Sequence, residues 1–202
     1  NLVALNEGKV SLDDKVEVLA YQTPEFYPDT QKRTLNKIQQ EITATPSSTW
    51  SQSKPLTLTC KQIIEETHDV KTFVFQCEEV EEFDYIAGQH LPIEFNVNGQ
   101  PVKRQYTLSS TPTTPESITI TVKRIDDGEI SNFIHENFAV GDTIKALPPT
   151  GDFHLEKAQQ DKILFLTAGS GITPALSMFR TMIAQGDKRD TVFFHSTQMT
   201  RD

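Results

Sequence analysis

The sequence predicts an antiparallel, six-stranded β-barrel followed by a partial α/β unit, and three observations support this fold class. First, five runs with alternating apolar and β-branched residues, each bounded by turn residues, follow Pro55. Second, a helical segment and one more short strand, near Thr143–Leu147, come next. Third, beyond Gly151 the pattern changes to strand, helix and strand, which is how a parallel sheet covered by helices begins.

The predicted barrel strands can be placed from their turns. The five runs are Leu56–Ile64, Val70–Cys77, Leu91–Val97, Val102–Ser109 and Ser117–Lys123. Asn98 and Gly99 separate the third run from the fourth, and this pair tolerates the positive φ angles of a two-residue type I′ hairpin. The helix that follows places apolar side chains on one face, at Ile130, Phe133, Ile134 and Phe138.

The α/β unit is predicted to contain the strands Ile163–Leu166 and Thr191–His195 and the helix Pro174–Ala184. Thr173 and Pro174 suit the N-cap and the first helical position, so the helix is expected to begin there. One strand-helix-strand unit is too short for a whole nucleotide-binding domain. Residues 160–202 are therefore predicted to be a truncated one.

Upstream of the barrel, two short β-like runs occur at Leu2–Leu5 and Val16–Leu19, and helical spacing follows from Leu35 to Ile42. We expect residues 1–45 to be the tail of an upstream β domain with a short helix, residues 46–55 a linker, and residues 56–155 the barrel. Because the chain starts at Asn1 and stops just after a strand, we expect it to be a fragment.

The composition excludes several function classes. With 28 acidic against 19 basic residues the formal charge is −9, which is unfavourable for binding nucleic acid. No apolar run approaches the roughly 20 residues of a membrane helix, and no secretory signal is present, so we expect a cytoplasmic protein without a membrane partner. Two cysteines and five histidines show no metal-binding spacing.

The segment from Arg104 to Ser110, at the end of a predicted strand, is the most informative motif. Side chains alternate along a strand, so Arg104 and Tyr106 share a face that offers a cation for a phosphate and a ring for stacking. Gln105 and Thr107 point to the other face. The alternative is an ordinary strand with a solvated arginine.

Two further segments could bind anions. Asp127-Gly128-Glu129-Ile130-Ser131 lies where a strand ends and a helix begins, and Gly169-Ser170-Gly171-Ile172-Thr173-Pro174 occupies the same kind of position further along. Exposed amides at a helix N-terminus bind phosphates without a basic residue. A plain N-cap by Ser131 or Asp127 is the alternative for the first segment. The second departs from the Rossmann pattern, because Pro174 stands in place of the third glycine.

Taken together and in this order, the three segments resemble the ferredoxin-NADP reductase superfamily over residues 55–202, with its R-x-Y-[ST] strand, G-x-x-S helix start and Gly-rich turn. The resemblance implies a Greek-key flavin-binding barrel followed by a nucleotide domain. It also implies roles for individual residues. Arg104 would hold the pyrophosphate of FAD, Tyr106 would stack on the isoalloxazine, and Thr107 would bond near its reactive nitrogen, which makes Tyr106 and Thr107 the candidate catalytic residues.

The resemblance assigns the remaining cofactor-binding residues by position. Gln105, Val122 and Lys123 would line the flavin, Gly128, Glu129, Ile130 and Ser131 would surround the diphosphate, and Gly169, Ser170, Gly171, Ile172, Thr173 and Pro174 would receive NADH or NADPH. Many relatives that prefer NADPH carry an arginine where this chain has Gln198, so NADH is preferred. The later strands of the nucleotide domain, with their Cys-Gly pair, are absent from this sequence.

A second resemblance concerns the first 20 residues, which look like the last strands of a MOSC domain. Fusions of such a domain to a reductase often carry a C-terminal 2Fe-2S domain. An unrelated β-hairpin is the alternative for this segment.

The expected function is an oxidoreductase that passes electrons from NAD(P)H through FAD to an iron–sulfur or haem acceptor in another domain or protein. Two alternatives stay open. One is a flavin-binding adaptor module without turnover, and the other is the electron-supply part of a MOSC-type molybdenum-cofactor or sulfur-carrier protein.

Overall fold

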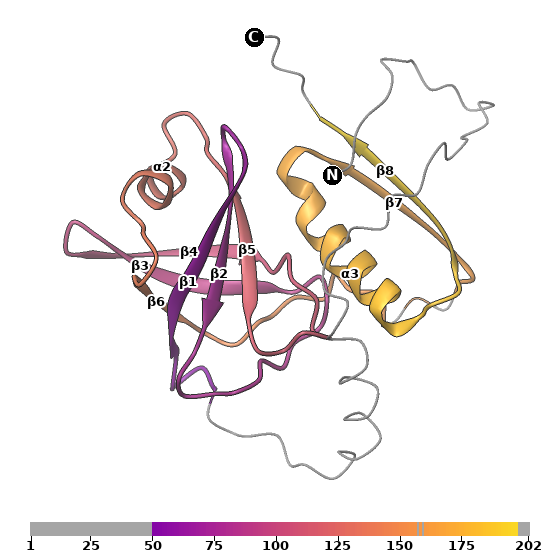
Figure 1. Ribbon diagram of the computed structural model, residues 1–202, viewed down its shortest axis with the longest axis horizontal. Helices are drawn as coiled ribbons and strands as arrows, with labels where there is room; N and C mark the ends of the chain where they lie inside the picture. Colours follow the sequence, from indigo (N-terminus) through magenta and orange to yellow (C-terminus); the bar gives the residue numbers. More distant parts are fainter. Residues whose placement is uncertain (1–49, 157, 159, 198–202) are drawn as a thin grey trace. The chain divides into compact units, whose positions relative to one another are not determined.

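The computed structural model describes residues 50–156, 158 and 160–197 (Figure 1). The predicted MOSC-like tail, its helix, most of the linker and Gln198 lie outside the described residues. The described part contains one antiparallel sheet, one parallel strand pair and two α-helices. None of the helices in these ranges combines the length and the hydropathy that crossing a membrane requires.

Six antiparallel strands form the predicted barrel, which confirms the fold class. They are β1 (Leu56–Thr67), β2 (Val70–Gln76), β3 (His90–Val97), β4 (Gln100–Thr107), β5 (Ile118–Lys123) and β6 (Thr143–Ala146). The order is β4-β3-β6-β1-β2-β5, so β6 returns to lie between β3 and β1, as in a Greek key. The edge strands meet at a single bridge between Leu108 and Ile120, so the sheet curves without closing fully.

Alternation of apolar residues produces these strands. In β5, Ile118, Ile120 and Val122 are buried, while the residues between them are partly exposed. Inward-facing residues of this kind from the other strands except β4 join them in one hydrophobic core, against which Val102 and Tyr106 of β4 pack while partly exposed. The hairpin between β3 and β4 is confirmed, because Asn98 (φ 51°) and Gly99 (φ 83°) both have positive φ.

The predicted strand ends are less accurate than the strands themselves. β1 continues to Thr67, three residues beyond the expected Ile64, and pairs there with β2 through Glu65↔Lys71 and Thr67↔Val70. This extension is polar and exposed, so hydrophobic alternation gives no signal for it.

Helix α2 (Glu129–Glu136) follows β5 and buries Ile130 and Ile134. Phe138 lies beyond the helix rather than on its face, and packs against the rings of Phe73 and Phe75. The helix is therefore held to the barrel both by its own apolar face and by the segment that follows it.

The α/β unit consists of β7 (Lys162–Ala168), the 3₁₀ turn η1 (Gly169–Gly171), α3 (Ile172–Gln185) and β8 (Asp190–Ser196). The two strands pair in parallel beside α3 (Figure 1). Phe165 lies opposite Phe193, and both rings contact Phe179 of α3. Another face of the same strands is open, since Leu164 and Leu166 are exposed.

The expected start of this helix is wrong. Helix α3 begins at Ile172 with Gly171 as its N-cap, and Thr173 and Pro174 lie inside its first turn. Proline is tolerated there because the first four amides of a helix have no partner within it. The Thr173 hydroxyl instead donates to the carbonyl of Ser170, which joins the glycine turn to the helix.

Candidate FAD and nucleotide site

The arginine of the strand motif meets the start of α2. Arg104 is half-exposed on the edge strand β4, and its Nη2 lies 3.5 Å from Oε2 of Glu129, the first residue of α2. Its Nη1 donates to the carbonyl of Lys103. Two segments that are 25 residues apart in the sequence therefore come together at one place.

Tyr106 lies two residues further along β4 and is half-buried. Its ring is edge-on to Phe95, with 6.2 Å between the centroids. Burial raises the pKa of the Tyr106 phenol, and the nearby Arg104 charge opposes that rise only in part, so the side chain stays neutral at physiological pH. It presents an uncharged ring beside the guanidinium.

Thr107 and Gln105 complete the strand motif. Thr107 is half-buried, and Gln105 is exposed, as Arg104 is. His90 of β3 lies directly across from Thr107, and its backbone exchanges two hydrogen bonds with Thr150. Sequence reasoning tested the five histidines only for metal-binding spacing and gave His90 no role, because its position opposite Thr107 depends on the register of the paired strands.

The end of β5 is fixed by a side chain from α2. Val122 is buried, and its carbonyl oxygen accepts a hydrogen bond of 2.9 Å from Nε2 of His135. The neighbouring Lys123 ammonium lies 3.2 Å from a carboxylate oxygen of Asp69. The Val122 carbonyl thus already has a partner, and His135 joins helix and strand in a way the sequence did not reveal.

The N-terminus of α2 has no side-chain cap, so the interpretation of Ser131 or Asp127 as a plain N-cap is wrong. Gly128 is the N-cap, and the Ser131 hydroxyl accepts from the amide of Ile125 and donates to the carbonyl of Gly128. A Cβ at Gly128 would lie 2.3 Å from that hydroxyl oxygen, so only glycine fits. The first amides of the helix remain available to an anion.

The glycine turn after β7 is open to solvent. Gly169 (φ +50°), Ser170 and Gly171 are all exposed, and a Cβ at either glycine would have no atom within 4 Å. Ile172 and Pro174 are partly exposed, whereas Thr173 is buried. Cα atoms of this turn lie within 8 Å of Cα atoms in β5, the strand that carries Val122 and Lys123. The third segment therefore lies next to the barrel.

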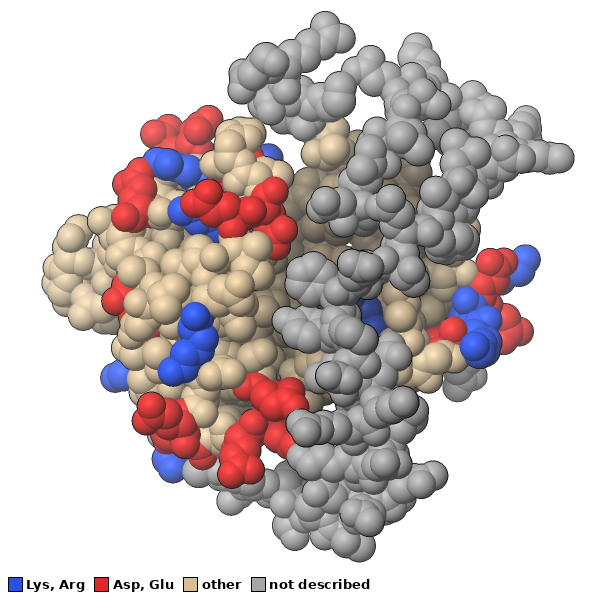
Figure 2. Space-filling model, in the orientation of Figure 1, with Lys and Arg blue, Asp and Glu red and all other residues tan. Residues whose placement is uncertain are grey.

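Charge on the surface follows the acidic composition. Figure 2 shows Asp and Glu side chains in groups over the barrel face in view, with Lys and Arg side chains between them. Within the described ranges, no three His, Cys, Asp or Glu residues are gathered as metal ligands would be.

Comparison with known proteins identifies the barrel. Residues 55–155 match the family model described as the oxidoreductase FAD-binding domain, which is the segment that folds into the six strands. The chain belongs to this family.

Curated relatives of this FAD-binding domain include reductase subunits. The chain is 38% identical over 156 residues to the glycine betaine monooxygenase reductase subunit of Chromohalobacter salexigens, which covers 77% of this chain and 42% of that protein. It is 36% identical over 148 residues to a stachydrine N-demethylase reductase subunit of Rhizobium meliloti, and the match covers 73% of this chain and 41% of that protein. The chain thus spans about two fifths of the length of these relatives.

Solved structures show the same arrangement of the FAD-binding barrel. The FAD/NAD-binding domain of a nitric oxide dioxygenase from Vibrio cholerae is 27% identical with a TM-score of 0.65, covering 71% of this chain and 63% of that one. A second structure is that of phthalate dioxygenase reductase, described as a modular structure for electron transfer from pyridine nucleotides to [2Fe-2S]. It is 25% identical with a TM-score of 0.65, and the match covers 73% of this chain and 45% of that one.

Replacing Gly171 by alanine is expected to separate nucleotide binding from folding. The added methyl meets no protein atom, so the unfolding temperature and the FAD affinity should stay within error of the wild type. If the turn receives a nucleotide phosphate, as the resemblance implies, the methyl would occupy the open space that the phosphate needs, and NAD(P)H should bind about tenfold more weakly. Stopped-flow titration with NAD(P)H measures this, and an unchanged nucleotide affinity would remove the turn from the binding site.

Proposed function

We propose that the whole protein passes electrons from NAD(P)H through FAD to a one-electron acceptor, an iron–sulfur or haem centre. The observation that carries the proposal is the meeting of Arg104 with the uncapped start of α2 at Glu129, because it places a guanidinium and free helix amides beside each other. Such a pair is suited to a diphosphate.

The residues present fit FAD. Arg104 and the amides of Glu129, Ile130 and Ser131 would hold the diphosphate. The amide of Gly128 already donates to the carbonyl of Ile125, so Gly128 would contribute the open backbone at the helix start, where a Cβ would lie 2.3 Å from the Ser131 hydroxyl oxygen. Tyr106 would stack on the isoalloxazine, and Thr107 would bond near its reactive nitrogen. Gln105, Val122 and Lys123 would line the flavin. A diphosphate site favours FAD over FMN.

When bound, FAD supplies the redox chemistry, accepting electrons in pairs and releasing them singly, and the protein supplies position and electrostatics. Tyr106 keeps its proton at neutral pH, so it adds a neutral aromatic face rather than a charge next to the ring. No general acid or base is required of the chain, and the described side chains act by binding, orienting and excluding water.

The turn from Gly169 to Pro174 would receive the nicotinamide nucleotide. Its support is the open space at both glycines and its nearness to β5. We infer that NADH is preferred to NADPH because Gln198 offers no charge for a 2′-phosphate, although that residue lies outside the described ranges. The acceptor would be a separate protein or a further domain, such as the 2Fe-2S domain implied by the resemblance; related reductase subunits support an oxygenase-type partner.

An absorption spectrum of the full-length protein, followed by anaerobic titration with NADH and with NADPH, tests the proposal. We expect the bands of bound flavin, and their loss on addition of one equivalent of either nucleotide, with faster reduction by NADH than by NADPH. Flavin that stays oxidised with both nucleotides would instead indicate an adaptor module. Additional iron–sulfur bands would identify the acceptor.

A further inference from the structure

A row of hydrogen bonds joins the barrel to helix α3. It links three consecutive residues that follow the R-x-Y-T motif, Ser109, Ser110 and Thr111, to Ser177, Arg180 and Thr181, which lie on one face of α3. We refer to these six residues as the barrel–helix contact. The two sides are 67 to 71 residues apart in the sequence.

The central bond is buried. The Ser177 hydroxyl, which has no exposed surface, donates to the carbonyl of Ser110 at 2.5 Å. The Ser110 hydroxyl is itself held by the Tyr85 phenol (2.8 Å) and the amide of Thr119 (3.0 Å). The segment that α3 contacts is therefore rigid on the barrel side.

The two bonds on either side of the Ser177–Ser110 bond also have a defined donor and acceptor. Arg180 Nη1 donates to the carbonyl of Ser109 at 2.8 Å. The Thr181 hydroxyl gives its single proton to the carbonyl of Ser177, so in the 2.9 Å pair with Thr111 it must accept. The Thr181 hydroxyl is thus a donor within its own helix and an acceptor from the barrel, and the observed orientation of α3 satisfies all three bonds to the barrel together.

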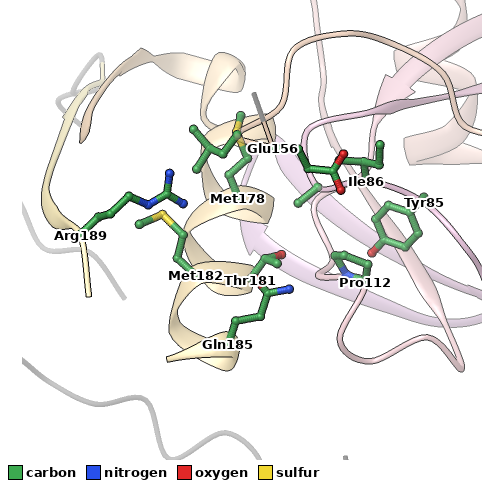
Figure 3. A pocket seen from close by; sticks show the side chains of 11 residues that line it. Tyr85, Ile86, Pro112, Glu156, Met178, Thr181, Met182, Gln185 and Arg189 are labelled. Carbon is green, nitrogen blue, oxygen red and sulfur yellow. The ribbon is translucent and has the colours of Figure 1, made fainter. Parts of the chain in front are cut away.

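Apolar packing between the two parts is sparse. The barrel core and the α/β core are separate clusters, and Ala87 is the single residue from the barrel side within the buried α/β cluster. Between the loop Tyr85–Ala87 and α3 there is a cavity of about 340 Å³, with Met178 and Met182 on its helix side (Figure 3). Parts joined by a small, largely polar interface are expected to move relative to each other unless specific bonds fix them.

We propose that Ser177 and Thr181 are positioning residues, which set the distance between the flavin and the nicotinamide. This inference rests on the proposed function. Helix α3 starts at the glycine turn, and the contact begins two residues after Thr107, so the six residues connect the two proposed binding segments. Misplacement by about 1 Å slows a reaction that depends on close approach by up to about 100-fold.

The test uses the full-length protein with Ser177→Ala and Thr181→Val, singly and combined. We expect the single-turnover rate of flavin reduction by NADH to fall about tenfold in the double variant, with unchanged FAD affinity. Thr181→Ser keeps the hydroxyl and should restore the wild-type rate. Thr191→Val is the matched control, because Thr191 bonds only locally, to the carbonyl of Arg189.

A second readout does not depend on turnover. Spin labels at Lys61 and Ala184, both exposed, report the distance between the barrel and α3 once Cys77 is replaced by serine. The distance distribution should be narrow in the wild type and roughly twofold broader in the double variant. An unchanged distribution, or a broader one with an unchanged reduction rate, overturns the inference. If neither nucleotide reduces the flavin of the wild type, the proposed function fails. The spin-label distances still decide whether the barrel–helix contact fixes the position of α3 relative to the barrel.

Discussion

Replacing Gly88 by alanine is expected to destabilise the fold strongly. Gly88 has φ +103°, and a Cβ there would lie 2.1 Å from the backbone oxygen of Phe153 and 3.2 Å from the terminal methyl carbon of Met178. A backbone atom cannot turn aside as a side chain can, so the loop before β3 would have to separate from the segment that leads to β7. We expect a loss of about 3–5 kcal/mol in the free energy of unfolding, against a total of roughly 5–15 kcal/mol for a domain.

Gly141→Ala is the matched control for this prediction. Gly141 has nearly the same φ, +99°, but a Cβ there meets nothing within 4 Å. It should lose only the roughly 1–2 kcal/mol of left-handed strain. Denaturant unfolding of both variants measures the difference, and equal losses would show that the contact with Phe153 is not the cause.

Replacing Arg104 by alanine is expected to weaken FAD binding by about 10- to 100-fold. A charge-assisted hydrogen bond from a guanidinium to a phosphate contributes roughly 1.5–3 kcal/mol, and each 1.4 kcal/mol corresponds to a factor of ten in the dissociation constant. Arg104 is half-exposed and lies outside the buried core, so the fold should survive the change. Fluorescence titration of the apoprotein with FAD gives the affinity.

Two variants control for this result. Lys103→Ala removes the same charge from the neighbouring residue, whose ammonium is directed to Glu94 at 3.8 Å, and it should leave FAD affinity nearly unchanged. Glu129→Gln removes the carboxylate that pairs with Arg104, so FAD should bind as well or more tightly. If Lys103→Ala weakens binding as much as Arg104→Ala does, net charge alone governs the affinity.

Local sequence patterns predict the elements of this fold but not their ends. Alternation finds five barrel strands, and the short sixth strand is expected after the helix. Asn98-Gly99 predicts the hairpin because two consecutive positive φ angles favour those residue types. The polar end of β1 is missed, since nothing in its composition distinguishes a paired polar strand from a loop. Thr173 and Pro174 give a false helix start, because the 3₁₀ turn at Gly169–Gly171 leads directly into α3.

The candidate site is predictable only where its residues are consecutive. The three proposed binding segments stand out in the sequence, and their order points to the family. The contacts between segments do not stand out. Neither the Arg104–Glu129 pair nor the Ser177–Ser110 bond has a local signal, because each depends on how distant strands and helices pack. Serine and threonine are common on any helix, and only the fold shows which of them are buried against the barrel.

The dissociation constants of FAD and FMN for the same apoprotein test the central claim most directly. If Arg104 and the start of α2 together hold a diphosphate, FAD should bind at least about tenfold more tightly than FMN, and the Arg104→Ala variant should lose most of that preference. Equal affinities for FAD and FMN in the wild type would contradict the account.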